Sequence, residues 1–275
     1  LYIDTKTKAL HRQEAKVVCV AGNSIETPRL FLMSASSMFP NGLANSSDQV
    51  GRNYMRHLTG SVYARFDKPV NFYRGETMAG FLADEVKNNP KRGFVGGYYL
   101  ETLALGPSFM GAFLEPGGWG KKFADMMDGY RNLAGMWIVG EDMPQANNRI
   151  TLGSAKDAFG LPAPNVHFDD HPNDTAMRNH AYKVGEKNYK SVGAKQTWRT
   201  TPYPHTHNLG TMRMSAKKKD GVTNKGGRCH DIKNLFVSDG SVMTTGAACN
   251  PTLTIVALAI RQGEYLADQL KKGKI

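Results

Sequence analysis

Short apolar stretches that stop at glycine turns open the sequence. Residues 15–21 read Ala-Lys-Val-Val-Cys-Val-Ala and are followed by Gly22, a pattern that predicts a buried parallel strand ending in a tight turn. A helix that opens at Thr27-Pro28 is expected next, because proline at the first helical position loses no needed hydrogen bond. In open α/β sheets, such turns at the carboxyl ends of strands face the ligand crevice.

The middle of the chain has a different pattern. From about Tyr54 to Thr200 it is rich in aromatic residues and glycine and alternates in polarity, which predicts strands in a different layer. The strands and the helix expected there cover residues 93–100, 136–139, 149–152 and 175–189, with a turn at 171–174 leading into the helix.

The pattern of the opening returns after Thr200, with a predicted strand over 234–238 that ends at Asp239-Gly240. A last helix is predicted from Pro251 to about Leu270. Its first half is almost wholly apolar, which is typical of a deeply buried helix. We therefore predict one domain built from residues 1–53 and 201–275, with a second domain over residues 54–200.

Composition and charge narrow the range of partners. With 40% hydrophobic and 21% charged residues, the chain has the composition of an ordinary globular protein, so disorder should not dominate. Its net charge of +11 could attract nucleic acid, an acidic membrane or an acidic protein. The basic residues are scattered, however, and the runs at 217–219 and 271–274 contain no aromatic residues that could stack on bases. We expect solvated surface there, with partner docking as the alternative, and no nucleic-acid partner.

The cysteines and the hydropathy pattern give little sign of a metal site or a membrane span. Cys19, Cys229 and Cys249 have no C-x-x-C spacing, so neither a zinc site nor a disulfide framework is indicated, and Cys249 is expected to be a small packing residue. No stretch approaches the roughly 18 consecutive apolar residues of a transmembrane helix. Residues 1–7 predict a strand and a turn inside a folded unit, so we expect a truncated chain.

Asn250-Pro251-Thr252 is the first candidate for chemistry. Asparagine is a favoured N-cap, proline suits the first helical position, and the helix end carries partial positive charge. Such an end can stabilise an anion or a carbonyl that becomes anionic. The alternative is that Asn250 only caps a core helix.

Two histidines two positions apart form the second candidate. If the segment is extended, His205 and His207 lie on one face and could share a metal, but no third ligand is evident and the H-x-H spacing is weak evidence. One of them could instead be a general base, because an imidazole accepts a hydroxyl proton at neutral pH. Both could also be purely structural.

Strand ends supply a third group of candidates. Asp239-Gly240 offers a carboxylate to ribose or ribityl hydroxyls, and glycine lets the backbone approach them closely. A plain turn is the alternative. The pair Gly22-Asn23, after the first strand, allows the same two interpretations.

Taken together, three motifs resemble the glucose-methanol-choline (GMC) oxidoreductase family. They are residues 21–30 with 50–57 downstream, residues 207–214 (His-Asn-Leu-Gly-Thr-Met-Arg-Met), and residues 234–240 leading to 250–254. The similarity is greatest to the branch of bacterial FAD-dependent glucose, gluconate and fructose dehydrogenases, and residues 141–145 and 148–152 resemble the substrate domain of that branch. The order and spacing of the motifs agree over nearly the whole chain.

The resemblance implies a fold and an activity. The fold is α/β with mixed α+β character: a partial Rossmann-like FAD-binding domain with an inserted antiparallel-sheet substrate domain. The activity is oxidation of a sugar or polyol hydroxyl, an aldose such as glucose being the first expectation, by base-assisted hydride transfer to flavin N5. His207 is the implied base, Asn250 holds the substrate hydroxyl, and His205 supports them from outside the site.

The resemblance also implies FAD contacts. Asp239 and Gly240 are expected at the ribityl-pyrophosphate part, and the amides near Pro251 and Thr252 at the flavin ring. Gly22 and Asn23 complete the expected cofactor site. We further expect the Asn250 amide to serve the substrate, with Thr252 helping at the helix end.

One departure from the family pattern is large. The Gly-x-Gly-x-x-Gly turn that holds the FAD pyrophosphate does not occur, and Gly117-Gly118-Trp119-Gly120 is expected to be a loop. We therefore expect the N-terminal half of the same protein to be missing, and FAD retention by this chain alone to be weak or absent.

Partners and alternatives follow from the same resemblance. Relatives in this branch work with a small accessory subunit and a multihaem cytochrome c in the periplasm, associated with the membrane through those subunits, and some bind an iron-sulfur cluster in the half absent here. A cytochrome or another non-oxygen acceptor is the expected electron sink. An oxygen-using oxidase of the same fold and a fragment without independent activity are the alternatives.

Overall fold

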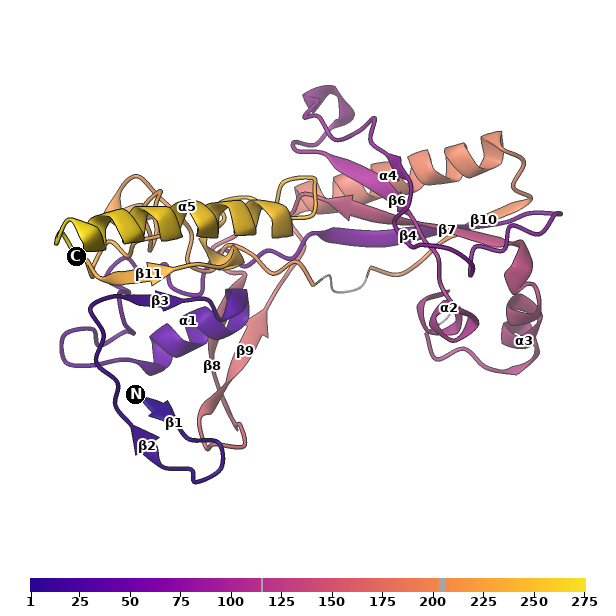
Figure 1. Ribbon diagram of the computed structural model, residues 1–275. Helices are drawn as coiled ribbons and strands as arrows, with labels where there is room; N and C mark the ends of the chain where they lie inside the picture. The colour runs from indigo at the N-terminus through magenta and orange to yellow at the C-terminus, as the bar shows by residue number, and fades with distance from the viewer. Residues whose placement is uncertain (115, 203–205) are drawn as a thin grey trace.

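The computed structural model describes residues 1–114, 116–202 and 206–275. Figure 1 shows a part that contains a five-stranded sheet and a part that contains both ends of the chain. Within these residues, every helix is too short or too polar to span a bilayer.

The larger sheet is antiparallel and has the strand order β10-β4-β7-β6-β5. Its strands are β4 (Leu58–Arg65), β5 (Phe81–Leu82), β6 (Tyr98–Thr102), β7 (Leu133–Gly140) and β10 (Gln196–Arg199). The register pairs Leu58 and Tyr98 with Gly140. The start of β4, the start of β6 and the end of β7 therefore lie together at one end of the strands, and this end is the sheet edge at which the site lies.

Helices cover both faces of this sheet because its side chains alternate. Val62 and Ala64 pack into a core shared with the long helix α4 (Pro172–Ser191), whereas Tyr63 packs with Leu114 of α2 (Pro107–Leu114) in a second core. A short helix, α3 (Gly120–Asp128), lies beside α2. The antiparallel sheet expected from the sequence is thus present.

A parallel pair of strands organises the other part. β3 (Val18–Val20) pairs with β11 (Leu235–Val237), and each is followed by a turn at the same edge. Phe31 of α1 (Asn23–Met33) shares a core with Val237 and Met212, so residues from both ends of the chain pack together. The helix α5 (Thr252–Lys271) lies beside β11 in Figure 1.

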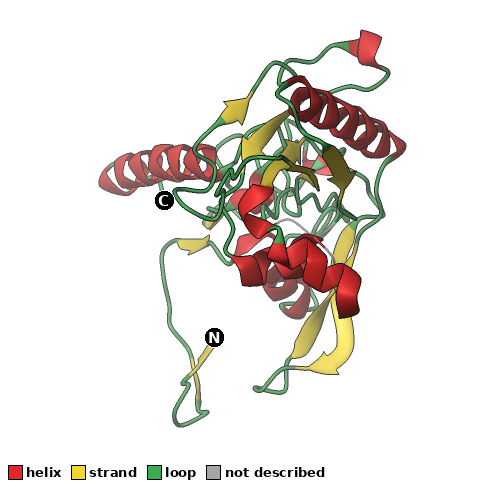
Figure 2. Ribbon diagram, turned by 90° about the vertical axis from the view of Figure 1, so that its right-hand side faces the viewer, coloured by secondary structure: helices red, strands yellow, loops and turns green. Residues whose placement is uncertain are grey.

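Two hairpins complete the described elements. β1 (Tyr2–Ile3) pairs with β2 (Leu10–His11), and Figure 2 shows this hairpin projecting away from the body. β8 (Arg149–Lys156) pairs with β9 (Pro162–His167) and contacts α1. This hairpin belongs to the predicted second domain (54–200) but packs on a helix of the 1–53 segment of the predicted first domain. The division of the chain into 1–53, 54–200 and 201–275 therefore stays a prediction. Short 3₁₀ turns cover residues Pro90–Arg92, Tyr130–Asn132, Lys218–Asp220 and Gly240–Val242.

The start of α1 differs from the prediction at Thr27-Pro28. The helix begins at Asn23, whose side-chain oxygen accepts from the N–H groups of Ile25 and Glu26. Pro28 therefore lies inside the helix and cannot donate to the carbonyl of Ser24. The buried hydroxyl of Thr211 donates to that carbonyl instead, at 2.8 Å, which explains how the helix tolerates the proline.

Two burial predictions were wrong. β3 is parallel as expected but exposed, with Val18 45% accessible. α5 buries only Gln262 and Leu266, whereas Leu253 is 81% and Ile260 59% exposed. Apolar sequence alone predicted burial, but the described residues cover only the side of α5 that faces β11.

The starts of two further elements differ from the predicted ones. The strand expected over 93–100 begins at Tyr98. The helix expected from residue 175 begins at Pro172, because the ring of His171 accepts from the Asn173 N–H and Asp174 accepts from the His171 N–H in a reciprocal cap.

Candidate functional site

Two imidazoles meet at the edge of the sheet where β4 begins. The Nδ1 atoms of His57 and His207 are 3.1 Å apart, and the rings are nearly perpendicular, at 89°. His57 is 1% exposed and has a left-handed backbone, with φ of 61°. His205, the neighbouring candidate, lies outside the described residues.

Burial keeps both imidazoles neutral. It lowers the pKa of His207 to about 4, and the nearby His57 adds to the effect. Burial also lowers the pKa of His57, although its hydrogen bond with the Gly246 carbonyl opposes the change. At neutral pH His207 is therefore uncharged and able to accept a proton, which is what a general base needs.

Asn250 is exposed and is held by β6. Its side-chain Nδ2 donates to Oε1 of Glu101 at 3.0 Å, and the Tyr99 hydroxyl donates to the same oxygen at 2.7 Å. Burial and the Glu101 carboxylate raise the pKa of Tyr99, so this hydroxyl stays protonated and keeps donating. Oε2 of Glu101 is buried and has no hydrogen-bond partner among the described residues.

The structure excludes the alternative that Asn250 only caps a helix, and the help expected from Thr252 at the helix end was wrong. The N-cap of α5 is Pro251, and no side chain of the described residues, Thr252 included, makes a cap hydrogen bond there. The Nδ2 of Asn250 donates to Glu101, and the first-turn amides of α5 have no side-chain acceptor among the described residues. The expectation that the Asn250 amide serves a substrate stays a prediction.

One short segment connects the two candidate groups. The Gly246 carbonyl lies 2.7 Å from Nε2 of His57, and four residues later Asn250 bonds Glu101. The segment that follows His207 is anchored as well: the Tyr54 hydroxyl donates to Oδ1 of Asn208 at 2.5 Å, and Ser24 Oγ donates to its carbonyl at 2.7 Å. His207 and Asn250 are thus both fixed to the sheet edge, through different residues.

The predicted cofactor residues come together at the carboxyl ends of the parallel strands. One oxygen of Asp239 accepts from the Asn23 N–H at 3.0 Å and from the Thr27 hydroxyl at 2.6 Å. The other accepts from the N–H and the hydroxyl of Ser241. With four donors the carboxylate is saturated, so Asp239 itself fixes the turn, and any ligand contact here falls to backbone groups.

The start of α5 adjoins this turn. A Cβ placed on Gly240 would lie 3.0 Å from Cδ1 of Ile255, in the first turn of α5. Gly22, Asn23, Asp239 and Gly240 therefore lie together at the strand ends, and the helix that follows Pro251 and Thr252 begins beside Gly240. Uncapped amides and a strand-end turn fit the anionic and carbonyl groups of a dinucleotide. The contacts to FAD remain a prediction.

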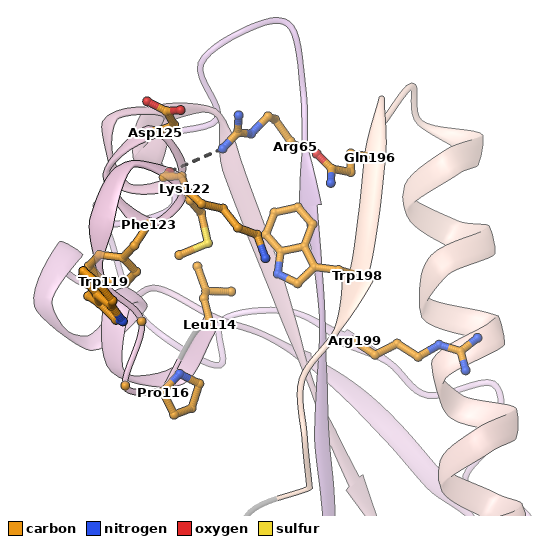
Figure 3. Close-up of a pocket in the computed structure, with 13 residues that line it drawn as sticks. Arg65, Leu114, Pro116, Trp119, Lys122, Phe123, Asp125, Gln196, Trp198 and Arg199 are labelled. Atoms are coloured by element: carbon orange, nitrogen blue, oxygen red, sulfur yellow. Dashed lines mark hydrogen bonds between the residues drawn. The ribbon is translucent and has the colours of Figure 1, made fainter.

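A large cavity lies elsewhere, between α3 and the far end of β4 and β10 (Figure 3). It encloses about 730 Å³, with Trp198 and Gln196 on one side and Trp119 and Phe123 on the other. Arg65 ends β4 there, seven positions from Leu58, or about 23 Å at about 3.3 Å per residue. The cavity is separate from the histidine pair, and its rim contains residues 117–119 of the predicted loop, whose last residue, Gly120, instead begins α3.

Metal and cysteine chemistry find little support in the part of the chain that the structure describes. No three His, Cys, Asp or Glu side chains there are grouped closely enough to hold a metal ion. Cys229 is buried, but Cys249 is exposed, so its predicted packing role was wrong.

His57, Tyr99 and Glu101 are the site residues that the sequence did not reveal. His57 ends a recognised motif, residues 50–57, but nothing local assigned it a role. Glu101 left a weak signal, an acidic residue next to the apolar run Tyr98–Leu100.

Known proteins resemble the chain in sequence and in fold. Residues 144–259 match the C-terminal family model described as GMC oxidoreductase. The 2-methyl-1,2-propanediol dehydrogenase of Mycolicibacterium austroafricanum is 38% identical over 97% of the chain and 50% of that protein. The fructose dehydrogenase large subunit of Gluconobacter japonicus is 31% identical over 97% of the chain and 50% of that protein. The chain thus spans about half the length of these relatives.

A solved structure agrees in fold. The formate oxidase of Aspergillus oryzae RIB40, whose structure concerns modification of its FAD, matches 93% of the chain and 55% of its own with a TM-score of 0.63 and 17% identity. This similarity confirms the expected mixed fold. Family model, relatives and fold agree, and the chain belongs to the GMC oxidoreductase family.

Proposed function

We propose that the protein of which this chain is part oxidises a CH–OH group of a sugar or polyol with FAD as its cofactor. Family membership supports the class of reaction, and the two relatives, named for a diol and a sugar, support the class of substrate. The observation that carries the proposal is the position of His207, whose Nδ1 lies 3.1 Å from Nδ1 of the buried His57 where β4 begins, and whose partial burial keeps the ring neutral by lowering its pKa.

His207 and Asn250 divide the work on the substrate. FAD, when bound, supplies the acceptor for the two electrons and the hydrogen that leave the carbon. His207 takes the hydroxyl proton, because a neutral imidazole can accept it, and the alkoxide that results expels hydride more readily than an alcohol does. Asn250, held by Glu101, positions the hydroxyl.

Residues at the ends of the parallel strands and at the start of α5 would hold FAD. Backbone groups of Gly22, Asn23, Asp239 and Gly240 would contact the ribityl-pyrophosphate part, and the first-turn amides near Pro251 and Thr252 the flavin ring. The saturated Asp239 carboxylate supports this assignment, because it fixes the backbone that would make the contact.

We further propose that additional chain of the same protein covers α5 and β3. The relatives are about twice as long, and the exposed apolar residues Leu253, Ile260 and Val18 form surface that further chain could bury. Finer proposals are an aldose such as glucose as substrate, a small accessory subunit, a multihaem cytochrome c as acceptor, and a membrane-associated periplasmic location. The relative named as a large subunit supports a multi-subunit assembly.

Oxygen could instead be the acceptor. The structurally similar formate oxidase supports this second candidate. Peroxide released in proportion to substrate consumed would identify an oxidase, and dye reduction without peroxide a dehydrogenase.

The proposal is tested with the full-length protein. Dye reduction is measured with sugars and polyols for the wild type, for His207→Ala and for His11→Ala, which changes an exposed histidine in β2. We expect His207→Ala to lower kcat by roughly 10²- to 10⁴-fold and His11→Ala to leave it unchanged. Equal activity in His207→Ala and the wild type would reject His207 as the base.

A further inference from the structure

His57 offers one ring nitrogen to a group that can only accept. Its Nε2 lies 2.7 Å from the carbonyl oxygen of Gly246. A carbonyl has no hydrogen to donate, so Nε2 of His57 must carry one. The environment supports this arrangement, since the ring is 1% exposed and a Cβ on Gly246 would lie only 3.2 Å from Cδ2 of His57.

The other nitrogen of His57 then determines the state of His207. A neutral imidazole carries a single N–H, so with Nε2 protonated the Nδ1 of His57 is an acceptor. Nδ1 of His207, 3.1 Å away, must donate to it. The burial that lowers the pKa of His57 favours this neutral form. A doubly protonated His57 would reverse the bond and make Nδ1 of His207 the acceptor.

We propose that His57 is a positioning residue that fixes His207 as the Nδ1–H tautomer. The Nε2 atom of His207 is then the unprotonated nitrogen that accepts a proton. The inference rests on the proposed function, in which His207 is the base. A histidine can act as a base only if the nitrogen that reaches the substrate carries a lone pair and no hydrogen. Free imidazole prefers the Nε2–H form in water, so His57 imposes the less common tautomer.

The hydrogen bonds of His57 also connect His207, the proposed base, with the segment that carries Asn250. The hydrogen bonds run from His207 Nδ1 to His57 Nδ1 and from His57 Nε2 to the Gly246 carbonyl. Gly246 begins the segment that reaches Asn250, whose amide bonds Glu101. Displacement of His57 would therefore disturb both the tautomer of His207 and the segment that carries Asn250.

The tautomer can be measured directly. Long-range ¹H–¹⁵N correlation spectra of the full-length protein labelled with ¹⁵N-histidine distinguish Nδ1–H from Nε2–H rings. We compare the wild type with His57→Phe, which keeps a ring but no nitrogen, and with His57→Asn, whose Oδ1 can occupy the place of Nδ1 and accept. His207→Ala assigns the signal.

We expect His207 to be the Nδ1–H form in the wild type, to shift towards Nε2–H in His57→Phe and to return to Nδ1–H in His57→Asn. The kcat of His57→Phe should fall by roughly tenfold or more, towards the 10⁴-fold cost of a wrong tautomer in serine proteases, and KM should rise because the segment that carries Asn250 loses its bond to His57. An Nε2–H ring in the wild type, or an unchanged tautomer in His57→Phe, would overturn the inference.

Two controls separate this inference from the proposed function. If His57→Phe fails to fold, the wild-type spectrum and His57→Asn still decide the tautomer. If the tautomer behaves as expected while His207→Ala retains full activity, the proposed function fails and the positioning role of His57 stands.

Discussion

The side-chain amide of Asn250 donates to Oε1 of Glu101 at 3.0 Å, across 149 positions of sequence. Because Tyr99 donates to the same oxygen, Glu101→Ala would leave two donors without their acceptor. We expect a loss of about 1–3 kcal/mol in the free energy of unfolding and roughly a tenfold fall in kcat/KM. Glu101→Gln, which keeps Oε1, should be milder in both.

Denaturant unfolding and steady-state kinetics of the full-length protein measure the two effects. Glu76→Ala, at an exposed position outside α5, is the matched control and should change neither. A Glu101→Ala variant as stable and as active as this control would show that Glu101 does not hold Asn250.

Asp142 should make stability depend on pH. It is 1% exposed, two residues beyond the end of β7, and burial raises its pKa from 3.8 to about 7, against the opposing hydrogen bond from the Arg56 N–H. As the pH rises from about 4 to about 7, the unfolded chain loses this proton and the folded chain keeps it. Stability is therefore full at the acid end and falls by up to about 4 kcal/mol as the pH passes the folded pKa.

Asp142→Asn removes that titration. The difference in unfolding free energy between the variant and the wild type should move in favour of the variant as the pH is raised from 4 to 7. Urea unfolding at several pH values measures this difference, with the exposed Asp84→Asn as the control. A difference that stays constant with pH would contradict the raised pKa.

A double-mutant cycle should couple Thr211 with Pro28. Thr211→Val removes the donor to the Ser24 carbonyl and should cost about 1–3 kcal/mol. Pro28→Ala restores a helical N–H to the same carbonyl, so Thr211→Val should cost less in that background. Unfolding free energies of the four proteins measure the coupling, and strictly additive costs would refute the substitution of one donor for the other.

Flavin retention is a fourth prediction. The 275-residue chain purified alone should contain FAD well below one equivalent, because no Gly-x-Gly-x-x-Gly turn occurs in it and α5 is exposed. The ratio of flavin to protein absorbance measures this, with the full-length protein as the comparison. A stoichiometric flavin spectrum from the chain alone would contradict the prediction.

Local patterns predicted the elements but not what surrounds them. The alternation of side-chain polarity identified β7, and the apolar run before Asp239 identified β11. Both patterns arise because the polarity of a side chain in a strand depends on whether it faces the core or the solvent. The same reasoning failed for α5: an apolar face shows that a helix is suited to burial, but burial needs a covering surface, which the described residues do not provide.

The sequence likewise predicted one part of the candidate site, the residues at the strand ends, but not its long-range contacts. Gly22, Asn23, Asp239 and Gly240 meet because parallel strands end at one edge, which the sequence already indicated. The contacts of His57 with His207 and of Glu101 with Asn250 join residues about 150 positions apart, and no local pattern contains them. Asn250 bonds Glu101 in a distant strand, so the residues around Asn250 give no sign of this contact.

The segment Gly246–Asn250 also constrains how the protein is made. His57 and Glu101 leave the ribosome well before Gly246 and Asn250, so the hydrogen bonds that fix this segment can form only after most of the chain has been made. Contacts of such long sequence separation form late and slowly. A nascent chain that ends before residue 246 should therefore fold its five-stranded sheet and still expose the edge where the site belongs, which makes this edge the point most in need of protection during synthesis.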